Sequence, residues 1–146
     1  MPAYADTAFL FSLVLRDANS VAAGAYLSTH REALPLSPWQ HCELRNAIRL
    51  AQFRKHTSAS LAQTALNQIA SDLVSGDFVE TPLDWPAVLE EAERLSATHT
   101  ATIGVRTLDL LHIGAAKSLG LNVFLSFDDR QRACAKAAGL RVRPEA

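Results

Sequence analysis

The sequence predicts an α/β fold in which helices pack on a parallel sheet. Short β-type runs alternate with longer, Ala-rich segments of helical period along the whole chain. This alternation favours β–α–β units with right-handed crossovers. Apolar residues make up 49% of the 146 residues, enough for a sizeable core. No internal repeat, low-complexity tract or linker interrupts the pattern, so we expect one domain over residues 1–146.

The first third of the chain contains two strand candidates and two helix candidates. Residues 2–5 (PAYA) form a short strand candidate, and residues 8–15 (AFLFSLVL) are apolar all round, as in a buried helix. Asp17 is placed to cap a second helix over residues 17–31. Residues 33–36 (ALPL) form the second strand candidate in spite of their proline.

The middle of the chain has well-marked helix boundaries. Residues 37–40 (SPWQ) place Ser at the N-cap, Pro at the first helical position and Gln at the reciprocal position of a capping box. The helix that follows should run to about Arg54. Residues 58–75 repeat apolar side chains at helical spacing, and Gly76 is expected to end that helix. Residues 78–80 form a third strand candidate.

The last third repeats the alternation. Residues 86–98 predict a Glu-rich helix that is solvated on one side, and residues 107–119 predict a helix followed by glycine. Residues 122–126 (NVFLS) are the clearest strand candidate. A helix over residues 129–138 and a last strand over residues 140–142 complete the order.

Composition excludes several classes of protein. The net charge is −1, which does not suit a protein that binds nucleic acid through bulk charge alone. No apolar run approaches the ~20 residues of a membrane span. The N-terminal apolar stretch has no basic residues before it and contains Asp6, unlike a signal peptide. Cys42 and Cys134 lack metal-ligand spacing, and we expect both to be small core residues of a cytoplasmic protein.

Two aspartates stand at or just beyond the carboxyl ends of strand candidates. Asp6 comes after the first strand candidate and Asp128 after the fourth, each at the start of a helix. Ligands of parallel α/β sheets bind beyond the carboxyl ends of the strands. If these two strands are neighbours, the carboxylates of Asp6 and Asp128 emerge side by side.

Two further carboxylates lie on faces predicted to be apolar. At 100° per residue, Glu43 lies in the middle of an apolar helix side, over Trp39 and Leu50. Asp109 occupies the first turn of the helix over residues 107–119, on its apolar side, where the helix dipole favours a negative charge. Small residues at 114–116 of that helix are expected to allow close approach to the sheet.

Each of these residues has an alternative interpretation. Asp6 and Asp128 suit helix N-caps, and Asp109 suits a helix N-terminus for its charge alone. Glu43 fits a helix whose phase is misassigned, or a buried partner for an arginine. Taken together, four carboxylates at one sheet edge need a cation, because burial and like charge both oppose ionisation. Hard oxygen donors without a His or Cys cluster suit Mg²⁺ or Mn²⁺.

Four segments in this order and spacing resemble the PIN-domain family, and more narrowly the VapC-type toxins of bacterial toxin–antitoxin pairs. The segments are YADTAFLFSL, HCELRNAI, RTLDLLHIGAAKSLGL and VFLSFDDRQRACAKAAGL. The resemblance implies that Asp6, Glu43, Asp109 and Asp128 are the catalytic, metal-binding acids. Asp129 departs from the family pattern, in which this position is often basic, and its contribution is open. Three polar residues are expected to orient ligands or water, namely Thr7, Asn46 and Ser126.

The resemblance also implies a fold, an activity and partners. The fold would be a three-layer α/β/α sandwich with a five-stranded parallel sheet. The activity would be divalent-metal-dependent cleavage of RNA by the toxin of a type II pair, with a small antitoxin as partner and a homodimer as the assembly. Two alternatives remain open, a housekeeping PIN-type nuclease without an antitoxin and an inactive PIN-like binding domain. A phospho-signalling module fits less well, because no Lys follows a late strand.

Overall fold

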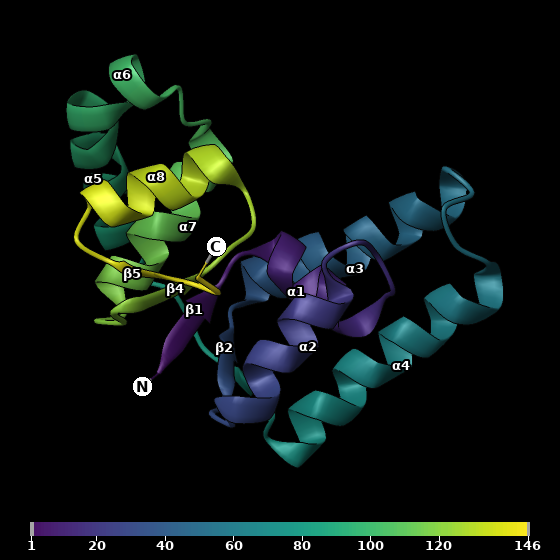
Figure 1. Cartoon of the computed structure of the whole chain (residues 1–146). Helices are drawn as coiled ribbons and strands as arrows, with labels where there is room; N and C mark the ends of the chain where they lie inside the picture. Colours follow the sequence, from purple (N-terminus) through teal and green to yellow (C-terminus); the bar gives the residue numbers. More distant parts are fainter. Residues whose placement is uncertain (1, 146) are drawn as a thin grey trace. The chain divides into compact units, whose positions relative to one another are not determined.

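The computed structural model describes residues 2–145, which divide into two compact units (Figure 1). One unit joins residues 2–6 to residues 82–145, and the other comprises residues 7–81. Each unit contains its own parallel strands and its own helices. The prediction of one domain over residues 1–146 is not tested by this division and stays a prediction.

The first unit is built on a three-stranded parallel sheet, drawn as neighbouring arrows in Figure 1. Its strand order is β1-β4-β5, and the strands are β1 (Ala3–Ala5), β4 (Val123–Leu125) and β5 (Arg141–Arg143). Ala5 lies opposite Leu125, and Leu125 lies opposite Arg143. The first and fourth strands are therefore neighbours, which was the condition set for bringing Asp6 and Asp128 together. All side chains of β1 and β4 are buried, as expected for strands covered on both faces.

Five helical segments belong to the first unit. They are α5 (Trp85–Leu95), the π-helical turn η1 (Ser96–Thr100), α6 (Ala101–Ile103), α7 (Thr107–Ser118) and α8 (Asp129–Ala137). The helix predicted to end at residue 98 thus continues through a π turn and a further short helix. The core under these helices joins Tyr4 and Phe124 of the sheet to Val88 of α5 and Ile113 of α7.

The close packing of α5 on α7 depends on a glycine. A Cβ at Gly114 would lie 2.8 Å from the carbonyl oxygen of Val88 and 3.4 Å from the backbone nitrogen of Ala92. Small residues in this part of α7 were expected to allow close approach to the sheet. The structure corrects that expectation for Gly114, whose bare Cα faces another helix.

The second unit contains four helices and two strands. In chain order they are α1 (Thr7–Val14), α2 (Ser20–Thr29), β2 (Leu34–Leu36), α3 (Pro38–Phe53), α4 (Ala59–Ser75) and β3 (Phe78–Glu80). The capping box predicted for α3 is confirmed. Ser37 Oγ accepts from the Gln40 N–H at 3.1 Å, and Gln40 Oε1 accepts from the Ser37 N–H at 2.9 Å. Gly76 ends α4 in the left-handed conformation, also as predicted.

Two local predictions in this unit are wrong. The helix expected from residue 17 begins at Ser20, because the Asp17 carboxylate accepts from the Asn19 N–H at 2.8 Å and holds a turn before the helix. Cys42 is exposed on α3 and is not a core residue, whereas Cys134 is buried as predicted. The helical phase decides the exposure of Cys42, since the buried side of α3 is centred on Leu44 and Ile48.

The prediction of a single five-stranded sheet is also wrong. All five strands exist and pair in parallel, but β2 pairs with β3 in a separate two-stranded sheet. On the edge of β2 that faces β3, the Leu34 N–H donates to the Asp77 carbonyl and the Leu36 carbonyl accepts from the Thr81 N–H. The backbone nitrogen of Pro35, between them, therefore faces the other edge of β2. A proline there has no N–H to donate to a further strand. The three-layer arrangement stays a prediction.

Within residues 2–145, no helix combines the length and the apolar character that crossing a lipid bilayer requires.

The packing of α5 on α7 generates a test of stability. We expect Gly114→Ala to lower the free energy of unfolding by about 1–3 kcal/mol, because the added methyl group meets a backbone oxygen that cannot rotate away. Urea denaturation followed by far-UV circular dichroism measures the change.

Gly24→Ala in α2 is the matched control. Gly24 is exposed, and a Cβ there has nothing within 4 Å. The same substitution should therefore stabilise the chain by about 0.5–1 kcal/mol through helix propensity. A Gly114→Ala protein as stable as Gly24→Ala would contradict the close packing of α5 on α7.

Candidate functional site

Asp6 lies at the carboxyl end of β1, where the sheet pairing continues for one more residue. Its backbone N–H donates to the carbonyl of Leu125 at 3.0 Å, which extends the β1–β4 ladder beyond Ala5. The residue is only 4% exposed. A carboxylate is rarely buried without partners, so this position is costly unless a positive charge or hydrogen-bond donors compensate it.

Asp128 follows β4 and is the N-cap of α8. Its Oδ1 accepts from the Gln131 N–H at 2.8 Å, and its own N–H donates to Ser126 Oγ at 3.1 Å. The helix-cap interpretation of Asp128 is therefore correct. It does not exclude a second role, because a carboxylate offers about four lone-pair positions and this cap uses one of them.

Asp109 lies in the first turn of α7 and interacts electrostatically with Asp128. Burial raises the pKa of the half-buried Asp109 carboxyl, and the negative charge of Asp128 raises this pKa further. Arg106 and His112 act in the opposite direction but do not cancel the shift. Two of the four predicted acids are thus close enough to repel each other.

A buried polar network fixes the backbone around these two aspartates. Ser126 Oγ donates to Gln131 Oε1 at 3.0 Å, and Gln131 Nε2 donates to the Asp109 carbonyl at 3.3 Å. Both Ser126 and Gln131 are almost fully buried. The network ties the end of β4, the start of α8 and the first turn of α7 together, so Asp109 and Asp128 cannot move apart independently.

Gln131 is a site residue that sequence analysis missed. It stands three positions after the N-cap Asp128, where a capping box places Gln or Glu. A Gln at this spacing is visible in the sequence, but in a capping box its side chain accepts a hydrogen bond from the N–H of the N-cap residue. Here Ser126 takes that N–H, which leaves the Gln131 amide to bridge Ser126 and Asp109.

In the second unit, Glu43 pairs with Thr7. Thr7 Oγ1 donates to Glu43 Oε1 at 2.7 Å, which joins the start of α1 to α3. Glu43 is half-buried at the edge of the packed side of α3. The sequence placed Glu43 in the middle of the buried side of α3, beside Leu50. This placement is wrong, because Leu50 is 37% exposed and the buried side is rotated away from both residues.

The remaining predicted residues lie at or near the surface. Asn46 is exposed on α3, and Asp129 is exposed in the first turn of α8. Arg132, which follows Gln131 in α8, has a structural role. Its Nη1 and Nη2 donate to the carbonyls of Ser126 and Pro144, each at 2.7 Å.

The predicted acids thus fall into two described groups. Asp6, Asp109 and Asp128 belong to the first unit, and Glu43 with its partner Thr7 belongs to the second. Within residues 2–145, no three His, Cys, Asp or Glu side chains are grouped closely enough to hold a metal ion. The joint assignment of all four acids to one metal site is therefore a proposal.

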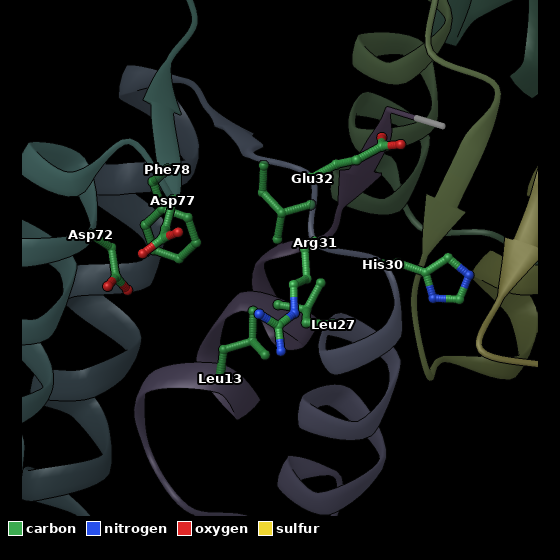
Figure 2. A pocket seen from close by; sticks show the side chains of 9 residues that line it. Leu13, Leu27, His30, Arg31, Glu32, Asp72, Asp77 and Phe78 are labelled. Atoms are coloured by element: carbon green, nitrogen blue, oxygen red, sulfur yellow. The ribbon is translucent and has the colours of Figure 1, made fainter.

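A pocket of about 320 Å³ in the second unit contains none of the predicted site residues (Figure 2). The Asp72 and Asp77 carboxylates lie on one side of it, and the His30 ring lies on the other. Burial and then the charge of Asp77 raise the pKa of Asp72, although a hydrogen bond from Gln68 opposes the shift. This acidic pocket does not suit a phosphate ligand.

Comparison with known proteins identifies the fold. The profile of the PIN domain family matches residues 3–137. A structure of VapC20 from Mycobacterium tuberculosis, a sarcin-ricin loop cleaving toxin, aligns with a TM-score of 0.67 at 18% identity and covers 97% of this chain and 99% of that chain. The structure of PAE2754 from Pyrobaculum aerophilum aligns with a TM-score of 0.62 at 21% identity and covers 97% of this chain and 83% of that chain. The structure of FitAcB from Neisseria gonorrhoeae aligns with a TM-score of 0.62 at 18% identity and covers 96% of this chain and 95% of that chain.

At these identities the solved structures establish a shared fold. No curated protein matches the sequence. The family profile nevertheless spans the chain from β1 to the last residue of α8. It includes all four predicted acids, and the chain belongs to the PIN domain family.

Proposed function

We propose that this chain is a divalent-metal-dependent endoribonuclease that acts as the toxin of a toxin–antitoxin pair. The observation that carries the proposal is the placement of three aspartates in the first unit. Asp6 directly follows β1, Asp128 follows the adjacent strand β4 by three residues, and Asp109 is close enough to Asp128 to be repelled by it. A nuclease that holds a cation beyond the strand ends needs such an arrangement.

The donor set fits a hard cation. Asp6, Asp109 and Asp128 offer carboxylate oxygens, and Glu43 with Thr7 offers a fourth carboxylate and a hydroxyl. The neighbouring soft donor is unsuitable, because burial and then the charge of Asp109 raise the pKa of the Cys134 thiol. His112 is also engaged, since its Nδ1 shares a hydrogen bond of 2.8 Å with Tyr4 Oη. The oxygen-only set favours Mg²⁺ or Mn²⁺ over Zn²⁺.

The residues of the chain would act by holding charge in place. Ser126 and Gln131 fix the backbone at Asp109 and Asp128, so the carboxylates stay together although they repel each other. A phosphodiester is negatively charged, and these carboxylates would repel it unless a cation is bound first. Bound Mg²⁺ or Mn²⁺ would lower the pKa of a water molecule, so that hydroxide is available near neutral pH. It would also offset negative charge on the phosphate.

The role as a toxin rests on the family and on a relative. VapC20, which shares the fold, is a sarcin-ricin loop cleaving toxin. The partners we propose with this role are RNA as substrate, a small antitoxin encoded beside this chain, and a second copy of the chain in a homodimer. An antitoxin side chain such as Arg would compensate the acidic site in place of the cation.

Purified protein should cleave structured RNA when Mn²⁺ is present and should not cleave it with excess chelator. We expect Asp6→Asn to reduce the cleavage rate by about 100-fold or more, since even residues behind metal ligands cost up to that factor. Gel analysis of a labelled RNA pool measures the rate. Asp77→Asn is the control, because Asp77 lies in the second unit outside the proposed site. Equal rates for wild type and a folded Asp6→Asn would remove Asp6 from the site.

Apo stability should respond to Asp109 in a predictable direction. Because folding raises the pKa of Asp109 above 3.8, the folded chain holds this proton to higher pH than the unfolded chain. Ionisation therefore costs stability as pH rises through this window. In chelator near pH 7, Asp109→Asn should be more stable than wild type by less than about 1 kcal/mol, since solvent screens a half-buried group. The difference should vanish below pH 3.8.

The same two proteins should differ in their response to metal. Millimolar Mn²⁺ should raise the melting temperature of wild type, because a ligand that binds only the folded state stabilises it. The rise should be much smaller for Asp109→Asn. A wild-type melting curve that ignores Mn²⁺, together with an Asp109→Asn protein that melts lower, is the pattern expected if Asp109 only supports its helix.

Induction of the wild-type chain alone should arrest bacterial growth, and Asp6→Ala should relieve the arrest. Co-expression of a short open reading frame adjacent to this gene should restore growth, and its product should co-purify with the chain. If induction leaves growth unchanged while the purified protein cleaves RNA, a housekeeping nuclease replaces the toxin. If neither effect is seen, an inactive binding domain replaces both.

A further inference from the structure

A hydrogen bond between Tyr4 and His112 lies in the core of the first unit, and the proposed chemistry makes no use of it. Tyr4 Oη and His112 Nδ1 are 2.8 Å apart. Tyr4 is fully buried, and His112 is only 4% exposed. The bond joins β1 directly to α7. It therefore connects the strand that leads into Asp6 with the helix that carries Asp109.

On the strand side, Tyr4 stands two residues before Asp6 in one extended segment. The Asp6 N–H donates to the Leu125 carbonyl at 3.0 Å, so the strand pairing persists as far as Asp6. Alternate residues of a strand share a face of the sheet, which places Tyr4 and Asp6 on the same face. At 3.2–3.4 Å per residue, Asp6 lies roughly 7 Å beyond Tyr4, toward the carboxyl end of the strand.

On the helix side, His112 stands three residues after Asp109. Residues at this spacing share a face of a helix. At 1.5 Å per residue, Asp109 lies about 4.5 Å nearer to the N-terminus of α7 than His112 does. Burial and the charge of Asp128 raise the pKa of the Asp109 carboxyl, and His112 is close enough to act against them. His112 and Asp109 are therefore neighbours on one helix face.

The two acids lie on the same side of this hydrogen bond. Only residues 119–122 separate α7 from β4, so the helix runs back against the direction of the strands. The Gln131 amide, in α8 beyond the end of β4, donates to the Asp109 carbonyl at 3.3 Å. The first turn of α7 thus lies at the carboxyl ends of the strands. Asp6 and Asp109 both extend from the bond toward that edge of the sheet.

The surroundings of the bond are apolar, which makes a polar pair there a choice with little gain in stability. The Tyr4 ring stacks on Phe124, with centroids 5.8 Å apart and an interplanar angle of 12°, and Ile113 belongs to the same core. A buried hydrogen bond adds little net stability, because its two groups give up hydrogen bonds to water. It does fix a distance and a direction, which apolar contacts leave freer. The Tyr4–His112 pair therefore contributes position more than stability.

We propose that Tyr4 and His112 are positioning residues that set the separation of the Asp6 and Asp109 carboxylates for a divalent cation. A polar network already ties α7 to α8, and the sheet ladder ties β1 to β4. The Tyr4–His112 bond supplies the third link, from β1 to α7. The inference rests on the proposed metal-dependent function, to which it adds two residues that act through the aspartates.

The test is Mn²⁺ binding by the full chain, measured by isothermal titration calorimetry at a temperature where every variant is folded. Tyr4→Phe removes only the hydroxyl and keeps the ring that stacks on Phe124. His112→Leu removes the ring nitrogen that meets the hydroxyl. Each should weaken Mn²⁺ binding by about tenfold, the lower end of the range for residues behind metal ligands. The double variant should also lose about tenfold, because the two side chains act through one shared bond.

His112→Asn is the matched variant of His112→Leu. Asn and Leu have nearly the same shape, but the Asn amide can donate to or accept from Tyr4 Oη near the position of Nδ1. His112→Asn should therefore recover most of the affinity that His112→Leu loses. Because Asn is uncharged, this recovery also separates the hydrogen bond from the charge of an imidazolium. An affinity for Mn²⁺ as low as that of His112→Leu would overturn the role of the bond.

Melting temperatures in chelator separate positioning from general damage to the fold. Each single variant leaves a buried polar atom without its partner, whereas the double variant leaves neither, so its melting temperature should recover toward wild type. Its Mn²⁺ affinity should not recover. Gly114→Ala is the control, because it destabilises the same helix through its contact with α5 and should keep the wild-type Kd for Mn²⁺. A structural role alone predicts that all these folded variants bind Mn²⁺ as wild type does.

The outcomes distinguish this proposal from the one on which it rests. If wild type binds Mn²⁺ and cleaves RNA while Tyr4→Phe and His112→Leu keep its Kd, the positioning role is overturned and the nuclease stands. If the double variant loses about a hundredfold, the two residues act separately and the shared bond is overturned. If wild type binds no Mn²⁺, both proposals are overturned. If the shared tenfold loss is found but no divalent metal supports cleavage, the positioning role stands and the nuclease function is overturned.

Discussion

The parallel pairing of β1 with β4 is the constraint on which the candidate site depends. The two strands are far apart in sequence, and their register sets Ala5 opposite Leu125. The Asp6 N–H completes the ladder by donating to the Leu125 carbonyl at 3.0 Å. Each strand has only three residues and then turns into a helix, so the acids that follow the strands inherit their positions from the pairing. A slip of one residue would turn the buried side chains of both strands over.

The electrostatics of the first unit run against stability. Burial and the charge of Asp128 both raise the pKa of Asp109, and a chain optimised for stability alone would not keep these groups together. The Ser126–Gln131 network holds them there with uncharged hydrogen bonds, which add no positive charge between the two carboxylates. Strain of this kind is common where a protein is built to receive a charged ligand.

Predictions based on local rules hold, and those that depend on tertiary context are less accurate. The capping box at Ser37 and Gln40 follows from adjacent residues and is confirmed. The β1–β4 pairing was considered as a condition and is present, and the order of strands and helices restricts a parallel sheet to few arrangements. The prediction of a single five-stranded sheet is wrong because the alternation of strands and helices in the sequence does not determine which strands share a sheet. Pro35 is visible in the sequence, but the edge that it faces depends on which side of β2 pairs with β3.

The same distinction explains the site. Asp6 and Asp128 are recognisable because strand ends are local features. Glu43 was misplaced because the apolar residues of α3 do not all lie on its buried side, and Leu50 is exposed. Gln131 was missed because its amide bonds to a backbone carbonyl 22 residues away, which no sequence spacing reveals. The basic character of residues 44–71 is not visible in the net charge. Net charge averages over the chain, and a value of −1 conceals a segment over residues 44–71 with four basic residues and no acid. A nearly neutral chain can therefore keep charges of opposite sign on different stretches of its sequence, and its net charge alone does not reveal this arrangement.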